Sequence, residues 1–327
     1  MPLGNIYPVW YGTTRKTATK ANGDTIYTND RGQSTNYGKA FVKISEDYLK
    51  SLAPKNIISN LFSSQSESHL KIRNTLPMIS SEFFNNLQSE LSSQRSADKY
   101  CVVYIHGFQT TFEEAIQRSA SIGYQLRVPA MVSFSWPSKG STAAYIADQQ
   151  AARTSAELLA QFLIKISKES RAEKIHLIAH SMGNYALLQT MLRPSMQAAI
   201  GKGLRFGQII LAAPDVDADE FIQDAGIYTE IADRVTLYAS TKDRALSASK
   251  TLSDYPRAGL LPPPMILPKM DTIDVSSADL SLLGHSYVAE EIDVLLDMYR
   301  LITDNRSPRE RPNISPVQNG RYWKMTQ

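Results

Sequence analysis

Residues 174–183, with the sequence Lys-Ile-His-Leu-Ile-Ala-His-Ser-Met-Gly, contain the pattern that decides the fold. Their apolar first part predicts a strand buried on both faces, and the residues that follow predict a helix. Ser181 lies on the turn between the two elements, and the small residues Ala179 and Gly183 allow strand and helix to approach closely. Such a turn exposes the serine hydroxyl beside a helix N-terminus, which favours developing negative charge. We therefore predict that Ser181 is a nucleophile, although Ala179 stands where the G-x-S-x-G pattern has its first glycine.

The alternation of strands and helices continues on both sides of this stretch. Strands are predicted at Tyr100–Ile105, Ala130–Ser135, Lys174–Ala179, Gln208–Ala212, Val235–Ala239 and Thr272–Val275, and helices at Thr110–Leu126, Asn184–Leu192 and Val288–Ile302. Short connections between such elements indicate parallel strands covered by helices on both faces. We therefore expect an α/β fold with a mostly parallel central sheet. The 22 residues between Ala212 and Val235 leave no room for a large cap domain.

The domain organisation follows from this pattern. We expect one domain over residues 1–303, in which 1–98 supply N-terminal strands and loops and 99–303 form the catalytic core. Within the first part, strands are predicted at Pro8–Gly12 and Ala40–Ile44. Residues 304–327 carry Arg306, Arg309 and Arg311 among Pro, Ser and Asn, a composition typical of a flexible C-terminal tail.

Composition excludes several classes of protein. The 35 basic and 32 acidic residues are interspersed and give a net charge of +3, which is too mild to indicate nucleic-acid binding. Cys101 is the one cysteine, so neither an intramolecular disulfide nor a cysteine-based zinc site is possible. No run of about 18 apolar residues predicts a membrane span, and the first thirty residues lack the apolar segment of a signal peptide. We expect a cytoplasmic protein without metal or cofactor, whose oligomeric state the sequence leaves open.

The general base can be found by elimination among five histidines. His69 lies in the polar N-terminal region, and His176 lies inside a predicted strand. His180 is adjacent to the serine, and His106 belongs to a loop discussed below. His285 follows the last predicted strand in a glycine-flanked loop, at the edge of the sheet where α/β proteins carry their chemistry. We predict that His285 takes the proton of the serine hydroxyl.

An oxyanion hole requires two backbone N–H donors aimed at the developing charge. We predict that Met182, the residue after the nucleophile, supplies one of them. The sequence Ile105-His106-Gly107-Phe108 follows an earlier strand, and Gly107 lets the backbone bend toward a substrate. The N–H of Phe108 is therefore the second predicted donor.

The acid that orients the histidine should follow a strand between Ser181 and His285 in chain order. Asp243 and Asp215 both satisfy this requirement, and we favour Asp243 because the strand before it lies farther along the order toward His285. Asp215 remains the alternative. The alternation of Asp215, Asp217 and Asp219 is similar to a calcium loop but lacks the required Gly and Glu, and instead predicts a helix N-cap.

With these residues identified, the chain resembles the α/β-hydrolases, and within them a bacterial esterase-like branch labelled as a domain of unknown function. The motifs that carry the resemblance are Val9-Trp10-Tyr11-Gly12-Thr13-Thr14-Arg15, His106-Gly107-Phe108, Ser133-Phe134-Ser135-Trp136-Pro137-Ser138, Tyr145 with Asp148, Ala179-His180-Ser181-Met182-Gly183-Asn184, Lys242-Asp243-Arg244-Ala245-Leu246, Thr272-Ile273-Asp274-Val275 and Gly284-His285-Ser286-Tyr287. The resemblance implies the α/β-hydrolase fold, a Ser-His-Asp triad and the hydrolysis of carboxylic esters.

Other segments are candidates for the substrate pocket. Trp136 follows a strand end and is predicted to form one wall, with an ordinary structural Trp-Pro turn as the alternative. Tyr145 begins the next helix and is a second candidate. Residues 254–268 form a Pro-rich, partly apolar insertion, which is either a small lid over the site or a packed connector.

The function expected from the sequence is that of a serine hydrolase acting on a small-molecule ester or acyl substrate through an acyl-enzyme. A lipase, a thioesterase or an acyltransferase would use the same triad. An α/β-hydrolase fold retained as a binding module without turnover is the alternative from another class, and fold alone does not separate these functions.

Overall fold

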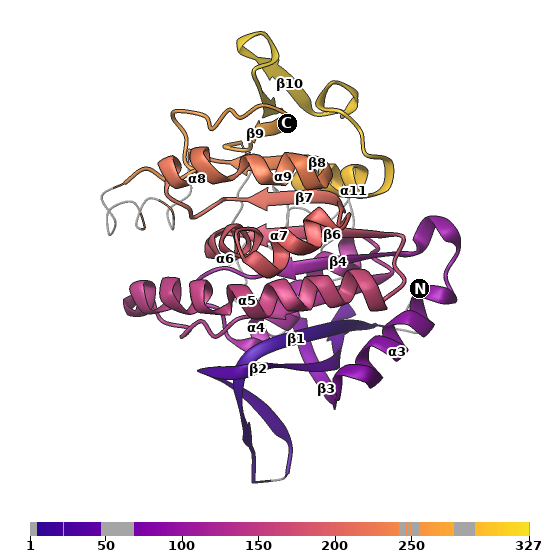
Figure 1. The fold of residues 1–327 in the computed structure, drawn as a ribbon. Helices are drawn as coiled ribbons and strands as arrows, with labels where there is room; N and C mark the ends of the chain where they lie inside the picture. The colour runs from indigo at the N-terminus through magenta and orange to yellow at the C-terminus, as the bar shows by residue number, and fades with distance from the viewer. Residues whose placement is uncertain are drawn as a thin grey trace.

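Eleven strands of the described chain join into one sheet in the order β10-β11-β9-β8-β7-β6-β4-β5-β1-β2-β3 (Figure 1). The computed structural model describes residues 5–21, 23–46, 69–241, 246, 249, 255–277 and 292–326. The strands are β1 (Ile6–Thr19), β2 (Thr25–Ile44), β3 (Leu70–Met78), β4 (Tyr100–Ile105), β5 (Ala130–Ser135), β6 (Lys174–His180), β7 (Phe206–Ala212), β8 (Ala232–Ala239), β9 (Met270–Asp274), β10 (Ile314–Val317) and β11 (Tyr322–Met325). The longer helices are α3 (Ser80–Ser92), α4 (Phe112–Gln125), α5 (Tyr145–Glu169), α6 (Met182–Met191), α7 (Pro194–Gly201), α8 (Ala218–Asp224), α9 (Gly226–Ile231) and α11 (Ile292–Asp304).

The centre of the sheet is parallel. Every neighbouring pair from β1 through β5, β4, β6, β7, β8 and β9 to β11 runs parallel, and the antiparallel pairs β1–β2, β2–β3 and β10–β11 lie at the two ends. Strands β4, β5 and β7 are buried along their whole length, as expected of parallel strands covered on both faces. The predicted α/β fold with a mostly parallel sheet is therefore confirmed, and its carboxyl-end edge is where the site is expected.

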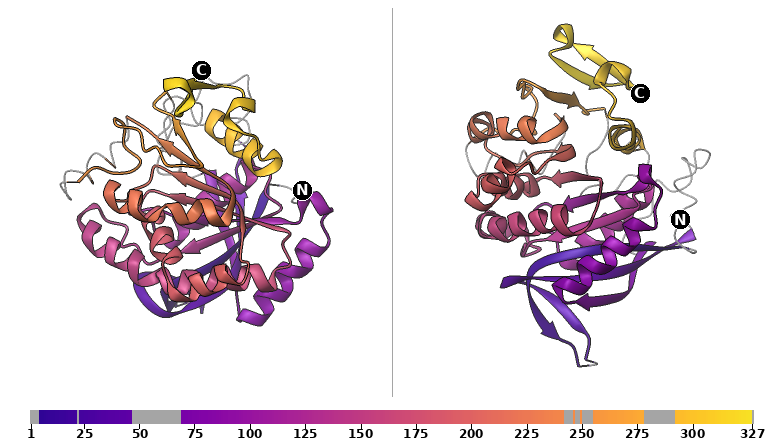
Figure 2. Two further views of the ribbon diagram at one scale, coloured as in Figure 1. Left: turned by 45° about the horizontal axis from the view of Figure 1, so that its top comes forward. Right: turned by 45° about the vertical axis from the view of Figure 1, so that its right-hand side comes forward.

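Two hydrophobic cores cover the two faces of the sheet, because successive side chains of a strand point to opposite sides. Along β4, Cys101, Val103 and Ile105 pack in one core together with apolar residues of α3, α5, α6, α8 and α9. Val102 and Tyr104 pack in the other core with residues of α4 and α11. Figure 2 shows α11, in yellow, on the opposite side of the sheet from the orange helices α8 and α9.

The N-terminal part is more regular than expected. The strands predicted at Pro8–Gly12 and Ala40–Ile44 are present, but they belong to β1 and β2, which extend as one long hairpin through the polar stretch between them. Cross-strand hydrogen bonds satisfy the backbone of this polar stretch, so it needs no apolar pattern to form strands. Of the part predicted as loops, residues 70–92 form β3 and the 13-residue helix α3, which buries Phe83, Phe84, Leu87 and Leu91.

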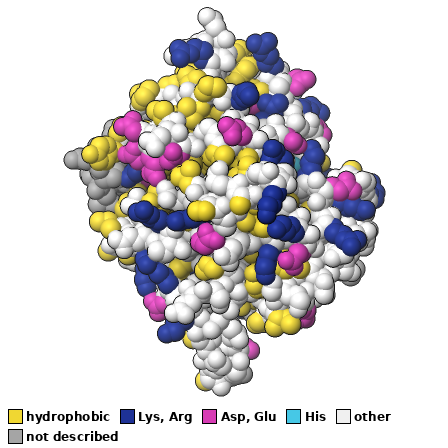
Figure 3. Space-filling view, in the orientation of Figure 1, with side chains coloured by type: hydrophobic (Ala, Val, Ile, Leu, Met, Phe, Trp, Pro, Cys, Tyr) yellow, Lys and Arg dark blue, Asp and Glu magenta, His cyan; other side chains and the backbone are white. Residues whose placement is uncertain are grey.

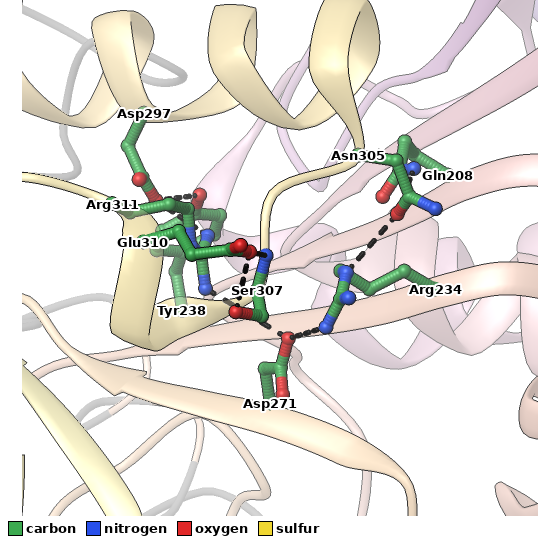
Figure 4. Close-up of polar contacts among 9 residues, drawn as sticks. All are labelled: Gln208, Arg234, Tyr238, Asp271, Asp297, Asn305, Ser307, Glu310 and Arg311. Carbon is green, nitrogen blue, oxygen red and sulfur yellow. Dashed lines mark hydrogen bonds and ion pairs between the residues drawn. The ribbon is translucent and has the colours of Figure 1, made fainter.

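The C-terminal segment differs from the flexible tail that its composition predicted. Strands β10 and β11 extend the sheet beside β9, and Trp323 and Met325 lie in the core that also contains α11. Upstream, Arg311 is buried and its Nη1 donates to Asp297 Oδ2 at 2.8 Å, while the Tyr238 hydroxyl donates to the same oxygen at 2.6 Å (Figure 4). Arg311 is therefore a buried partner of α11, which a count of polar residues does not reveal.

A second group of polar contacts holds the same segment to the strands. Arg234 donates from Nη1 to Asp271 Oδ2 at 2.8 Å and from Nε to Asn305 Oδ1 at 3.1 Å, and Gln208 Nε2 donates to Asn305 Oδ1 at 3.0 Å (Figure 4). On the surface, basic and acidic side chains are interspersed over the face drawn in Figure 3. Among the helices that the structure describes, none is both long and apolar enough to cross a bilayer.

Replacing Arg311 by Met should destabilise the fold strongly. The substitution leaves the buried Asp297 carboxylate without its cationic partner, which typically costs about 3–5 kcal/mol. Arg309→Met, at an exposed arginine two residues earlier, should leave the unfolding free energy nearly unchanged. Urea denaturation of the two variants measures the difference, and equal midpoints would mean that the segment is not anchored as described.

Candidate active site

Ser181 occupies a strained turn between β6 and α6. Its backbone has φ 51° and ψ −123°, a left-handed conformation that is costly for a residue with a side chain and persists only where the surroundings impose it. The Ser181 N–H donates to the carbonyl of Ala212 at 3.0 Å, and the Ser181 carbonyl accepts from the N–H of Asp215 at 3.2 Å. The end of β7 and the loop after it thus hold the turn, and the residue itself is half-buried.

The side chain of Asn184 joins the same pieces of backbone. It is buried, and its Nδ2 lies 3.1 Å from the carbonyl oxygens of Ala179, Ser181 and Ala212. These three carbonyls belong to the end of β6, the turn and the end of β7, so one amide stabilises the whole turn. The sequence places Asn184 beside the nucleophile but gives no signal for this role, because Ala212 is brought close only by the sheet.

Two glycines allow the turn to pack against the end of β4. A Cβ added at Gly183 would lie 2.6 Å from the carbonyl oxygen of His106 and still closer to that of Ile105, distances that no side chain tolerates. A Cβ added at Gly107 would lie 2.9 Å from Cβ of Ser181. The loop after β4 therefore lies directly against the serine.

The two predicted oxyanion donors belong to this contact region. Met182 is the first residue of α6, and Phe108 follows Gly107 in the loop after β4. Neither N–H donates a hydrogen bond to another residue that the structure describes. The Phe108 ring packs edge to face on the ring of Tyr145, with the centroids 5.4 Å apart. Both amides are thus available for a ligand beside Ser181.

His106 has a structural environment rather than that of a base. It is fully buried, its ring stacks on Trp136 with centroids 4.9 Å apart, and burial together with the charge of Arg15 holds its pKa well below the usual value. Trp136 is also fully buried, and its Nε1 donates to the carbonyl of His106 at 2.8 Å. The expectation that Trp136 lines a substrate pocket is therefore wrong, because the indole supports the loop from below and has no exposed surface.

Tyr145 belongs to a buried polar cluster around Asp215. Its hydroxyl lies 3.1 Å from both carboxylate oxygens and 2.6 Å from Ser249 Oγ, which itself donates to Asp215 Oδ1 at 2.6 Å. Arg257 Nε pairs with the same oxygen at 3.3 Å. Burial raises the pKa of Asp215, and the hydrogen bond from Ser249 and the charge of Arg257 partly offset this. Each oxygen of Asp215 thus lies within hydrogen-bonding distance of at least one described side chain.

The insertion after β8 packs against this cluster where the structure describes it. The side chains of Arg257 and Ala258 are buried. Gly259 contacts the loop after β7, because a Cβ added there would lie 2.6 Å from the backbone nitrogen of Pro214. The backbone of this segment also forms bridges to Asp217 and Ser240. Residues 256–260 are therefore a packed connector rather than a lid.

The remaining predicted residues are placed as follows. His176 lies inside β6, is buried, and its Nδ1 accepts from the N–H of Gln208 at 2.9 Å, so it is a hydrogen-bonded core residue. Asp217 Oδ1 accepts from the N–H groups of Asp219 and Glu220, which confirms the predicted N-cap of α8. His285 and Asp243 lie outside the described residues, so the structure gives no distance from Ser181 to either.

Comparison with known proteins identifies a family and distant structural relatives. The sequence profile of the family described as "Alpha/beta hydrolase of unknown function (DUF900)" matches residues 81–304. No curated protein sequence matches. A solved structure of esterase B from Lactobacillus rhamnosis, inhibited with a tributyrin phosphonate, is 13% identical with a TM-score of 0.35, over 64% of this chain and 77% of that chain.

Two further structures are equally distant. A lipase-esterase related protein from Clostridium acetobutylicum is 9% identical with a TM-score of 0.33, over 62% of this chain and 95% of that chain. A fungal esterase from Rhizomucor miehei is 12% identical with a TM-score of 0.35, over 93% of this chain and 86% of that chain. At such scores the likeness transfers no residue or substrate, and the family match carries the assignment.

Gly183→Ala should destabilise the fold and displace the serine turn. The added methyl meets two backbone oxygens that cannot move without shifting β4, and overpacking of this kind typically costs about 1–3 kcal/mol. Gly201→Ala is the matched control, because a Cβ at Gly201 meets nothing within 4 Å. Thermal unfolding compares the two variants, and a Gly183→Ala protein as stable as the control would contradict the close contact.

Proposed function

The chain belongs to the family of α/β hydrolases of unknown function, and on that premise we propose that it is a serine hydrolase acting on carboxylic esters. The observation that carries the proposal is the backbone of Ser181, with φ 51° at the junction of a buried parallel strand and a helix. A strained serine in this position presents its hydroxyl at the carboxyl-end edge of the sheet. The N–H groups of Phe108 and Met182, which donate to no residue that the structure describes, supply the complementary requirement for an oxyanion.

The reaction follows from these groups. The Oγ of Ser181 attacks the acyl carbonyl carbon while His285 accepts the hydroxyl proton, and the carbonyl π electrons move to the oxygen. The N–H groups of Phe108 and Met182 stabilise that oxyanion. Collapse of the intermediate expels the alcohol, which takes its proton from His285. Water, deprotonated by His285, then attacks the acyl-enzyme in the same way and releases the carboxylic acid and Ser181.

Asp243 is the proposed acid, with the role of holding the His285 imidazole in one tautomer and stabilising its cation. The surroundings of Asp215 support this choice. Its two oxygens are engaged by Tyr145, Ser249 and Arg257 in a buried cluster. A carboxylate with three such neighbours already has a structural role, which supports the choice of Asp243 as the acid.

Ser181→Ala should abolish ester turnover and covalent labelling while leaving the fold intact. A fluorophosphonate probe phosphonylates an activated serine with loss of fluoride, so the wild type should be labelled once, at Ser181. Hydrolysis of p-nitrophenyl esters of increasing chain length, with Ser133→Ala as a control, reports turnover and acyl preference together. Turnover retained by Ser181→Ala with an unchanged product would remove Ser181 from the mechanism.

Substitution of the two candidate acids should have opposite consequences. Asp243→Asn should lower kcat by a factor on the order of 10⁴ with little effect on unfolding, because the imidazole loses its orienting charge. Asp215→Asn should instead lower stability, since Arg257 is left without its buried counter-charge, and should retain most of kcat in the folded protein. Steady-state kinetics and urea unfolding are compared for both variants. The reverse pattern would transfer the acid role to Asp215.

A further inference from the structure

The loop after β4, residues 106–110, has its carbonyl groups held by specific donors. The carbonyl of Gly107 lies 2.8 Å from Nδ1 of His106, the Phe108 carbonyl accepts from the Thr110 hydroxyl at 3.1 Å, and the Thr110 carbonyl accepts from Arg15 Nη2 at 2.6 Å. The N–H groups of Gly107 and Phe108, by contrast, donate to no described residue. The three carbonyl contacts therefore fix the loop, while the N–H groups of Gly107 and Phe108 remain available to a ligand.

The contact between His106 and Gly107 sets the direction of one amide. In a trans peptide the C=O and the following N–H lie in one plane and point in opposite directions. The carbonyl of Gly107 and the N–H of Phe108 share such a plane. A donor that holds this carbonyl in place therefore also holds the Phe108 N–H pointing away from His106.

His106 can hold that carbonyl only in one tautomer. Its pKa is held low by burial and by the charge of Arg15, so the ring is neutral and carries a single N–H. Its Nε2 lies 3.1 Å from the carbonyl of Trp136, which already accepts from the N–H of Ser138 at 2.9 Å. No other described group donates to the carbonyl of Gly107. The hydrogen-bond needs of the two carbonyls therefore assign the proton to Nδ1.

Ser135 and Arg15 complete the relay on the other side of the ring. The Oγ of Ser135 lies 3.3 Å from His106 Nε2 and accepts from Arg15 Nε at 2.8 Å, so its own proton is free to go to Nε2. Arg15 is fully buried, and although burial lowers its pKa to about 10, it stays charged at neutral pH. Its guanidinium makes no ion pair with a described carboxylate and instead donates to backbone and side-chain oxygens.

We propose that Arg15 is a positioning residue for the proposed ester hydrolysis, which acts through Ser135 to fix the Nδ1–H tautomer of His106 and so aims the Phe108 N–H at the developing oxyanion. The inference rests on the proposed function for its catalytic consequence, but the hydrogen-bond relay exists independently of turnover. It accounts for an arginine buried in β1, where charged residues are costly without such partners. The positive charge of the Arg15 guanidinium, which contacts the loop at the Thr110 carbonyl, would also stabilise an oxyanion.

The relay can be tested with a matched pair of serines. Ser135 and Ser133 lie two residues apart in β5 and are both fully buried, but the Ser133 hydroxyl has no hydrogen-bond partner in the described structure. Ser135→Ala should lower kcat/KM for a short p-nitrophenyl ester at least tenfold with KM little changed. The loss in kcat/KM should not exceed the factor of about 10²–10³ that follows complete loss of one oxyanion donor. Ser133→Ala should retain the wild-type value.

The tautomer gives a readout that a merely structural role would not move. In ¹H–¹⁵N spectra of the full chain, His106 should carry its proton on Nδ1 in the wild type and in Ser133→Ala. In Ser135→Ala and Arg15→Met, a substantial fraction of the molecules should carry the His106 proton on Nε2. In the same two variants, the inhibition constant of a trifluoromethyl ketone should rise by the same factor by which kcat/KM falls. Arg311→Met, at another fully buried arginine, controls for lost stability and should leave the tautomer and the inhibition constant unchanged.

The outcomes separate the two proposals. A wild type with its proton on Nε2, or a Ser135→Ala protein with the kinetics of Ser133→Ala, would overturn the relay while leaving the proposed function standing. A folded wild type without turnover and without labelling at Ser181 would overturn the proposed function instead, and the spectra would still decide whether Arg15 sets the tautomer of His106.

Discussion

The close approach of α6 to the end of β4 is the constraint on which the arrangement of the site depends. Gly183 lies against the carbonyl oxygens of Ile105 and His106, where even one methyl group would collide with backbone. This contact leaves Ser181 on a turn with a left-handed φ, and the amide of Asn184 holds that turn to the ends of two strands. Strain of this kind persists because several elements impose it together.

Several buried charged groups near this contact have defined partners. Arg15 reaches from β1 to the loop after β4, and Asp148 accepts from the Ser138 hydroxyl at 2.5 Å and the Lys139 N–H at 2.8 Å. Asp215 and Arg257 form a buried ion pair after β7. Since a buried charge without partners costs several kcal/mol, these networks specify one arrangement of the loops. The fold alone would not give a function, but loops fixed in this way can position reacting groups.

Patterns that depend on neighbours in the chain were predictable, and those that depend on remote partners were not. The apolar runs of β4, β5 and β6 and the turn at Ser181 are local, so the sequence predicts them with only small errors at their ends. The polar hairpin of β1 and β2 has no apolar alternation to indicate strands. The prediction that Trp136 lines the substrate pocket was wrong for a related reason, because a tryptophan after a strand is equally compatible with a buried turn.

The sequence by itself determined the parallel α/β sheet and the strained serine turn, because periodicity and small residues at fixed spacing act within a few residues. Only the tertiary structure decided which polar residues are buried partners. Arg15 lies 120 positions before Ser135 in the chain and Arg311 lies 14 after Asp297, yet each arginine meets its hydrogen-bond partner only because the fold brings their segments together. Their side chains look like surface charges in the sequence. Burial and partners are properties of the assembled fold, and no local pattern encodes them.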